Sequence, residues 1–243
     1  MGKGLGVKTL SAFSAVHTDV YRHLMHLPLL SYSLFVPRRA PVRAAKATCF
    51  RPVILVHGLG GSRGDLLPME YYLRLFGRKQ TYRIDLSKKR SIKDMSRALA
   101  KFVERVLRVN QCEKVDLVGY SMGGIISRLA IEDHALGSAV HSLITLGTPH
   151  LGTVSAKFSD TPLSRSLRPD SPIIQRLKDL PWPEGVRGVS FWSRNDLLVL
   201  PSQTAAAAGT VQIDVSPFTH FSYLIDPRSW SHVRAALDGV SIG

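Results

Sequence analysis

The chain has 243 residues, of which 44% are hydrophobic and 21% are charged. This composition is typical of an ordinary globular protein, and the length suits one large domain with a substantial core. No apolar run reaches the roughly 18–20 residues that a membrane-spanning helix requires, so the sequence excludes an integral helical membrane protein.

The charge is less ordinary, because 32 basic residues against 18 acidic ones give a net charge of +14. Half of this excess lies in residues 1–51, and a second basic cluster lies between residues 78 and 93. The excess either serves solubility or attracts an anionic membrane surface such as phospholipid headgroups. Nucleic acid is not expected as a partner, because no recognised binding motif accompanies the charge.

The cysteines, histidines and first residues of the chain give no sign of a disulfide bond, a metal site or a signal peptide. Cys49 and Cys112 lie far apart, so we expect free thiols. No Cys/His cluster is visible, and we expect no metal and no cofactor. The first residues lack the apolar core of a signal peptide, which favours a cytoplasmic or membrane-peripheral location and leaves secretion open.

Two regions follow from the pattern along the chain. Residues 1–51 form a basic N-terminal extension, with a helix beginning near Val16, that we expect to pack on the main domain. Within residues 52–243, short apolar runs alternate with segments of helical periodicity. The expected strands are 53–56, 82–86, 114–118, 140–146, 188–192 and 210–215, and the expected helices are 65–76, one capped by Ser91, one after residue 121, 173–180 and 229–237. This alternation predicts a mostly parallel central sheet flanked by helices.

Residues 151–187 interrupt the alternation after the fourth core strand. The segment is rich in Ser, Pro and Arg and also carries scattered apolar residues. Long insertions in compact domains are often functional, which indicates a lid or cap. The alternative is that its apolar residues only cover the core.

The stretch Gly119-Tyr120-Ser121-Met122-Gly123 lies between an expected strand and an expected helix. A G-x-S-x-G sequence in this context is typical of the sharp turn that presents a nucleophilic serine. The flanking glycines are needed because the turn leaves no room for side chains. Ser121 is therefore the predicted nucleophile.

A nucleophilic serine needs a base and an acid that orients the base. Asp196 and His220 lie in loops after the last two expected strands and fit the chain order Ser…Asp…His. Asp196 is preferred over the other late carboxylates, Asp170, Asp179, Asp214 and Asp226. His220 is preferred over His232, which falls within the last expected helix.

The loop His57-Gly58-Leu59-Gly60-Gly61 follows the first apolar strand. Its glycines allow the main chain to approach a substrate closely, and an N–H there can stabilise an oxyanion. Backbone N–H groups of Leu59 and Met122 are the predicted oxyanion donors. His57 is expected to shape the loop and not to act as the base.

Taken together, these motifs resemble those of the α/β-hydrolases, and among them the bacterial triacylglycerol lipases and related esterases. The resemblance runs from about Pro52 to the C-terminus and includes Gly147-Thr148-Pro149-His150-Leu151-Gly152-Thr153, which is similar to a segment that lines the acyl pocket in those lipases. It implies an α/β-hydrolase fold and an esterase or lipase with Ser121, Asp196 and His220 as the catalytic triad. It also implies substrate contacts at Gly58, Thr148 and Pro149, and a small-molecule ester or lipid as substrate. The calcium site of some lipases has no match here.

Other functions stay open at this level. An acyltransferase uses the same triad with an alcohol or amine in place of water, and a non-catalytic lipid-binding protein can share the fold. Peptidase, thioesterase and lactonase activities also remain, because the fold does not fix the substrate. The oligomeric state is not predicted.

Overall fold

The structure is a computed structural model that describes residues 50–87 and 91–240, and the predictions made for residues 1–49 lie outside this part of the chain. Six strands form one sheet in the order β2-β1-β3-β4-β5-β6, and every neighbouring pair is parallel. The strands are β1 (Val53–Val56), β2 (Thr81–Ile84), β3 (Val115–Tyr120), β4 (Val140–Leu146), β5 (Arg187–Trp192) and β6 (Val211–Asp214). The predicted parallel sheet is thus confirmed.

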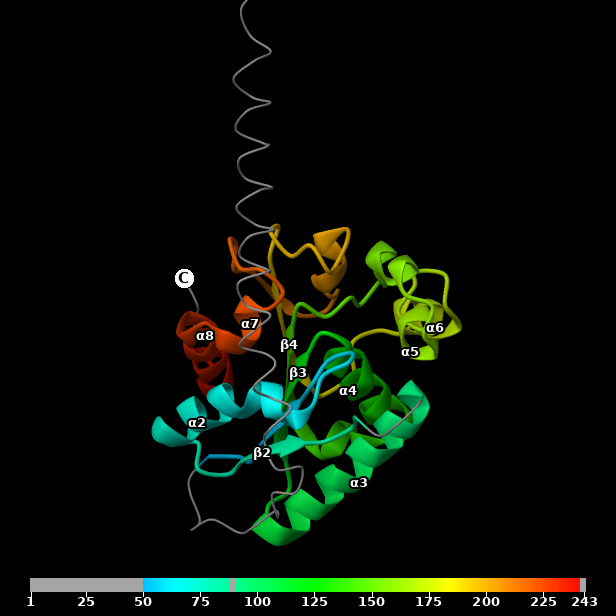
Figure 1. The fold of residues 1–243 in the computed structure, drawn as a ribbon. Helices are drawn as coiled ribbons and strands as arrows, with labels where there is room; N and C mark the ends of the chain where they lie inside the picture. Colours follow the sequence, from blue (N-terminus) through cyan, green and yellow to red (C-terminus); the bar gives the residue numbers. More distant parts are fainter. Residues whose placement is uncertain (1–49, 88–90, 241–243) are drawn as a thin grey trace, which may run out of the picture.

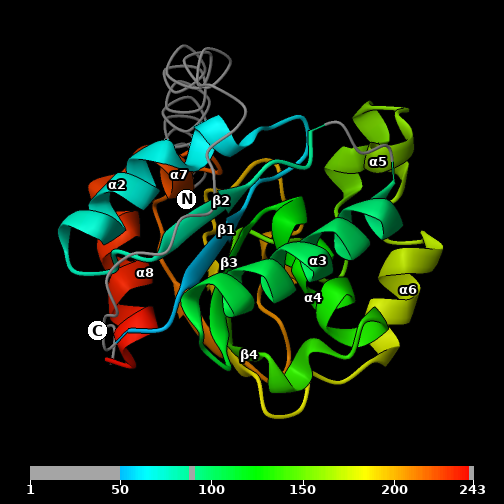
Figure 2. The same cartoon turned by 90° about the horizontal axis from the view of Figure 1, so that it is seen from below.

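Helices cover both faces of the sheet (Figures 1 and 2). One face carries α3 (Ile92–Asn110), α4 (Met122–Asp133) and α6 (Pro172–Asp179), and the other carries α2 (Leu67–Leu75), α7 (Ser222–Ile225) and α8 (Pro227–Asp238). The shorter elements are η2 (Arg63–Leu66), η3 (Leu136–Ser138), η4 (Val154–Phe158), α5 (Pro162–Arg165) and η5 (Ser202–Ala205). No helix of the described residues is long and apolar enough to cross a membrane.

The central strands of the sheet are buried on both faces and end close together. All four residues of β1 and all six of β3 are buried, as continuous apolar runs in parallel sheets require. Val56 pairs with Gly119, and Tyr120 pairs with Leu146, so β1, β3 and β4 end close together. The loops after these strands therefore meet at one edge of the sheet.

The helices follow local signals in the sequence. Ser91 caps α3 by accepting a hydrogen bond from the Asp94 N–H, and the buried face of α3 has helical spacing. The helix predicted over residues 65–76 is divided into η2 and α2. Ser62 and Asp65 form a capping box that starts a 3-10 turn, and Pro68 then fits the first turn of α2.

The connection between β4 and β5 has two parts with different surroundings. α6 buries Ile174 and Leu177 in the core that also contains α4, so this part covers the sheet. η4 lies at the carboxyl edge of the sheet, where Figure 1 shows the same segment beside the loop after β5. The segment predicted as a lid is therefore in part a cover for the core.

Candidate active site

Ser121 sits in the turn between β3 and α4 with a backbone φ of 53° and ψ of −124°. Residues other than glycine rarely adopt a positive φ, so the fold holds Ser121 in a strained conformation. A Cβ on Gly119 would come within 2.6 Å of Gly124, and one on Gly123 would collide with the carbonyl oxygen of Val56. The two glycines of the motif are thus required by close backbone contacts.

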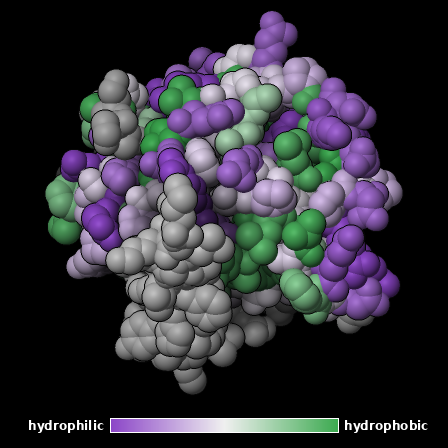
Figure 3. All heavy atoms as spheres, turned by 90° about the horizontal axis from the view of Figure 1, so that it is seen from above, coloured by the Kyte–Doolittle hydropathy of each residue, from purple (hydrophilic) through white to green (hydrophobic). Residues whose placement is uncertain are grey.

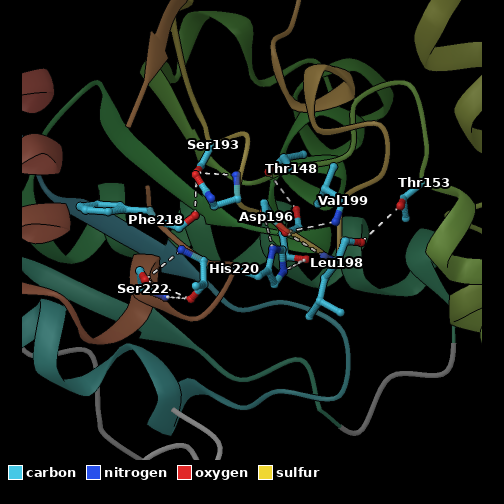
Figure 4. Close-up of polar contacts among 12 residues, drawn as sticks. Thr148, Thr153, Ser193, Asp196, Leu198, Val199, Phe218, His220 and Ser222 are labelled. Atoms are coloured by element: carbon cyan, nitrogen blue, oxygen red, sulfur yellow. Dashed lines mark hydrogen bonds and ion pairs between the residues drawn. The ribbon is translucent and has the colours of Figure 1, made fainter. Parts of the chain in front are cut away.

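The loops after β5 and β6 bring Asp196 and His220 to Ser121 (Figure 4). His220 Nε2 lies 3.0 Å from Ser121 Oγ, and His220 Nδ1 lies 2.7 Å from Asp196 Oδ2. Because a carboxylate only accepts, Nδ1–H donates to Asp196 and Nε2 is left to accept the Ser121 proton. The three predicted residues therefore form one continuous hydrogen-bonded chain.

Main-chain and hydroxyl contacts hold the two loops in place. Asp196 Oδ1 accepts hydrogen bonds from the N–H groups of Leu198 at 3.0 Å and Val199 at 3.1 Å. Ser193 Oγ donates to the carbonyl of Phe218 at 2.6 Å, which ties the loop after β5 to the loop that carries His220. These contacts fix the direction in which Asp196 faces His220.

Gly147 packs directly against the side chains of Asp196 and His220, and the sequence analysis did not predict this role. It has a φ of +53°, and a Cβ there would lie 2.9 Å from Asp196 Oδ2 and 3.2 Å from His220 Nδ1. Burial raises the pKa of the nearby Tyr120 and Tyr223 hydroxyls well above the usual value, so both stay neutral beside Asp196. In the sequence, this role could have been inferred from the glycine at the start of the Gly147–Thr153 motif.

A pocket of about 390 Å³ opens above Ser121. Its lining combines Ser121 and His220 with apolar side chains and with residues from η4 and the loop after β5: Leu59, Tyr120, Pro149, Thr153, Ser155, Ala156, Phe158, Ser159, Ser164, Leu167, Leu197, Leu198, Val199 and Phe221. Pro149, one of the predicted substrate contacts, is among these lining residues. A second open pocket, between β6 and α8, does not contact the triad.

Two residues predicted as substrate contacts do not line the pocket above Ser121. Thr148 is fully buried behind the turn and donates its hydroxyl to the carbonyl of Ser121 at 2.9 Å, so it supports the nucleophile and does not line the pocket. Gly58 is also absent from the lining. A Cβ on Gly58 would lie 3.0 Å from Ser121 Cβ, so glycine here lets the loop after β1 approach Ser121.

The contacts of His57 fit the predicted role in shaping that loop. Its Nε2 accepts the Leu86 N–H at 2.9 Å, which places the proton on Nδ1, where it is donated to the carbonyl of Gly58 at 3.0 Å. Burial lowers the pKa of His57, and it lowers the pKa of the fully buried His150 well below the usual value. Both imidazoles are neutral in the folded protein at pH 7.

We expect these two histidines to make the protein less stable in acid. Their pKa is lower in the folded state than in the unfolded state, so each contributes stability above pH ~6.5 that is lost as the pH falls. Each adds a slope of up to about 1.4 kcal/mol per pH unit. Urea denaturation at pH 7.5 and 5.0 should show a lower midpoint in acid, and His150→Gln should flatten the difference. An equal or higher midpoint at pH 5.0, or a pH difference that is unchanged in His150→Gln, would contradict this prediction.

The sheet order, the strained serine turn and the loops that meet it define the chain as an α/β-hydrolase. A palmitoyl protein thioesterase family model matches residues 52–206, and the chain belongs to this family.

Comparison with individual proteins agrees with this class. The chain is 34% identical over 116 residues to triacylglycerol lipases of Pseudarthrobacter phenanthrenivorans and Burkholderia plantarii. These matches cover 44% of this chain but only 35% and 32% of the two lipases, so the chain spans about a third of their length.

Solved structures show the same fold at lower identity. Aspergillus fumigatus lipase B superposes with a TM-score of 0.68 at 18% identity, over 84% of this chain and 60% of its own. Mature Bacillus licheniformis lipase BlEst2 gives a TM-score of 0.66 at 20% identity, over 82% of this chain and 96% of its own.

Proposed function

We propose that the protein is a serine hydrolase that cleaves carboxylic esters with an apolar acyl chain. The observation that carries the proposal is the hydrogen-bonded chain from Ser121 through His220 to Asp196 at the floor of the pocket. Family membership and the lipase relatives support the same reaction class. A wild-type protein that releases neither alcohol nor acid from a chromogenic ester series would contradict the proposal.

The reaction follows from the positions of the protons. As Ser121 Oγ attacks the ester carbonyl, its proton passes to His220 Nε2, 3.0 Å away. Asp196 holds Nδ1–H and stabilises the imidazolium that forms. His220 then protonates the leaving alcohol. In the second half, His220 takes a proton from water, the resulting hydroxide attacks the acyl-enzyme, and Ser121 Oγ recovers its proton as the acid leaves.

The oxyanion requires donors close to Ser121, and the backbone N–H groups of Leu59 and Met122 are proposed for this role. Met122 is the first residue of α4, where N–H groups have no partner within the helix and the helix dipole favours negative charge. Leu59 follows Gly58, where an added Cβ would lie 3.0 Å from Ser121 Cβ and 3.2 Å from the Tyr120 ring. Both N–H groups thus belong to segments in contact with the nucleophile.

The acyl chain is proposed to lie in the pocket above Ser121. The pocket lies within the range of about 300–1,000 Å³ found for small-molecule sites, and residues such as Leu59, Ala156 and Leu167 make part of its wall apolar. The part of the β4–β5 connection around η4 forms this wall, which is the cap role that we propose for it. Burial of the chain against this wall favours apolar acyl groups over polar ones.

The rim of the pocket carries exposed apolar side chains. Of the lining residues, Leu59, Phe158 and Leu198 are each more than 40% exposed, and Phe158 is 91% exposed. Leu151 and Val154 are also more than 40% exposed and lie between lining residues in the sequence. Figure 3 shows hydrophobic side chains gathered on this face, among hydrophilic ones. We propose that this rim contacts aggregated lipid, with the net charge of +14 favouring an anionic surface.

The rim is tested by Phe158→Ala. We expect the variant to lose activity toward an ester embedded in anionic vesicles by about fivefold, because an exposed aromatic ring no longer enters the lipid. Hydrolysis of a soluble short-chain ester should fall less, and only because Phe158 also lines the pocket. Tyr71→Ala is the matched control, since Tyr71 is 72% exposed on α2 and does not line the pocket. Equal losses in the two variants, or an equal loss on the soluble ester, would refute the role of the rim.

A further inference from the structure

Two chain segments are joined beside the triad, and Thr153 lies at their junction. The side chain of Thr153 is buried, and its Oγ1 accepts the Leu200 N–H at 2.8 Å. The same oxygen lies 3.2 Å from the carbonyl of Leu198, and Val154 N–H donates to the carbonyl of Leu200 at 2.9 Å. The start of the β4–β5 connection is thus bonded to the loop after β5.

This loop is the one that orients the catalytic acid. Asp196 Oδ1 is held by the N–H groups of Leu198 and Val199, while Oδ2 faces His220. Thr153 contacts the residues at both ends of the three-residue stretch 198–200 that supplies those N–H groups. Figure 4 shows Thr153 on the side of Leu198 and Val199 that faces away from His220.

The hydroxyl of Thr153 has a single proton to donate. It accepts the Leu200 N–H, and its own proton is shared among nearby oxygens, which are the carbonyls of Leu198 and Leu200 and the hydroxyl of Ser155. Ser155 Oγ donates to the Leu198 carbonyl at 2.5 Å and provides a second link. Without the Thr153 oxygen, the part-buried Leu200 N–H loses its acceptor, which is unfavourable because a donor shielded from water then has no partner.

We propose that Thr153 is a positioning residue for the reaction, because it holds the loop that aims Asp196 at His220. This role rests on the proposed ester hydrolysis. It also means that the pocket wall around η4 and the acid loop are held as one unit. The start of the β4–β5 connection therefore controls the orientation of Asp196, in addition to lining the pocket proposed for the acyl chain.

Thr153→Val removes the hydroxyl while keeping the size of the side chain. We expect kcat to fall about tenfold, because the orientation of Asp196 is lost. KM should change less than about threefold, because valine keeps the size of the side chain with which Thr153 lines the pocket. Labelling of Ser121 by a fluorophosphonate should slow in parallel, since it uses the same base. Thr153→Ser keeps a hydroxyl that can both accept and donate a hydrogen bond, so its kcat should stay close to that of the wild-type protein.

Thr161→Val is the matched control in the same segment. Thr161 Oγ1 accepts the Ser164 N–H at the start of α5, and Thr161 does not line the pocket. Its loss should lower the thermal midpoint by an amount similar to Thr153→Val and leave kcat unchanged. A Thr153→Val protein that keeps kcat, changes only KM, or loses no more kcat than Thr161→Val would overturn the proposal.

Ser155→Ala keeps the test decisive if Thr153→Val does not fold. Ser155 is only partly buried, so this substitution is mild, and it removes one link to the Leu198 carbonyl. We expect kcat to fall about threefold with KM retained, and an unchanged kcat would overturn the proposal. Failure of the proposed function is distinct, because the wild-type protein itself would then show no ester turnover.

Discussion

Ser121→Ala is expected to reduce ester hydrolysis about 10⁶-fold, the scale of loss when a serine hydrolase loses its nucleophile. Without Oγ, no acyl-enzyme forms, and the remaining groups only assist attack by water. The fold should persist, because alanine is smaller than serine and the hydrogen bond that is lost joins Ser121 Oγ only to a side chain of a loop, that of His220. Initial rates with a chromogenic ester, together with thermal unfolding, measure both expectations.

Ser127→Ala provides the control for this prediction. Ser127 is a fully buried serine about one and a half helical turns further along α4, and its hydroxyl donates to the carbonyl of Gly123. Such a bond to the preceding turn adds little to helix stability, so activity should stay within about threefold of wild type. A Ser121→Ala protein that retains a tenth of the activity would place the nucleophile elsewhere.

Asp196→Asn is expected to lower kcat about 10⁴-fold with little change in KM. The N–H groups of Leu198 and Val199 require an acceptor at the position of Oδ1, so the carbonyl oxygen of the asparagine must point there. The amide NH₂ then faces His220 Nδ1, which has to accept. His220 Nε2 would consequently carry the proton and could not take one from Ser121.

Two other carboxylates serve as controls for Asp196→Asn. Asp170 is exposed in the β4–β5 connection, and Asp214 at the end of β6 pairs with Arg194. Asp170→Asn and Asp214→Asn should each keep kcat within about threefold of wild type, since neither contacts His220. A larger loss of kcat in either control than in Asp196→Asn would contradict Asp196 as the acid that orients His220.

The central sheet could be predicted because its signals are local. Continuous apolar runs such as residues 53–56 have the length and composition of strands that are buried on both faces. Elements of four or five residues, such as η4, α5 and α7, were missed because so short a segment shows no helical period. The strand expected to reach Leu86 ends at Ile84, since the Leu86 N–H bonds to His57 instead of to a neighbouring strand.

The candidate site was predictable where chain order and turn chemistry decide it. Ser121 follows from its glycines, and Asp196 and His220 follow from loops that must meet at one edge of a parallel sheet. The supporting residues depend on contacts between segments far apart in the sequence. Nothing local in the sequence indicates that Thr148 lies under Ser121, or that Thr153 bonds to Leu200.

The most direct test of the central claim is to locate the covalent adduct formed with a fluorophosphonate carrying an alkyl chain. Mass spectrometry of the digested wild-type protein should place one equivalent of adduct on Ser121, and Ser121→Ala should take up none. Ser127→Ala should be labelled like wild type. An adduct on any other residue, or none on a folded wild-type protein, would contradict Ser121 as the nucleophile.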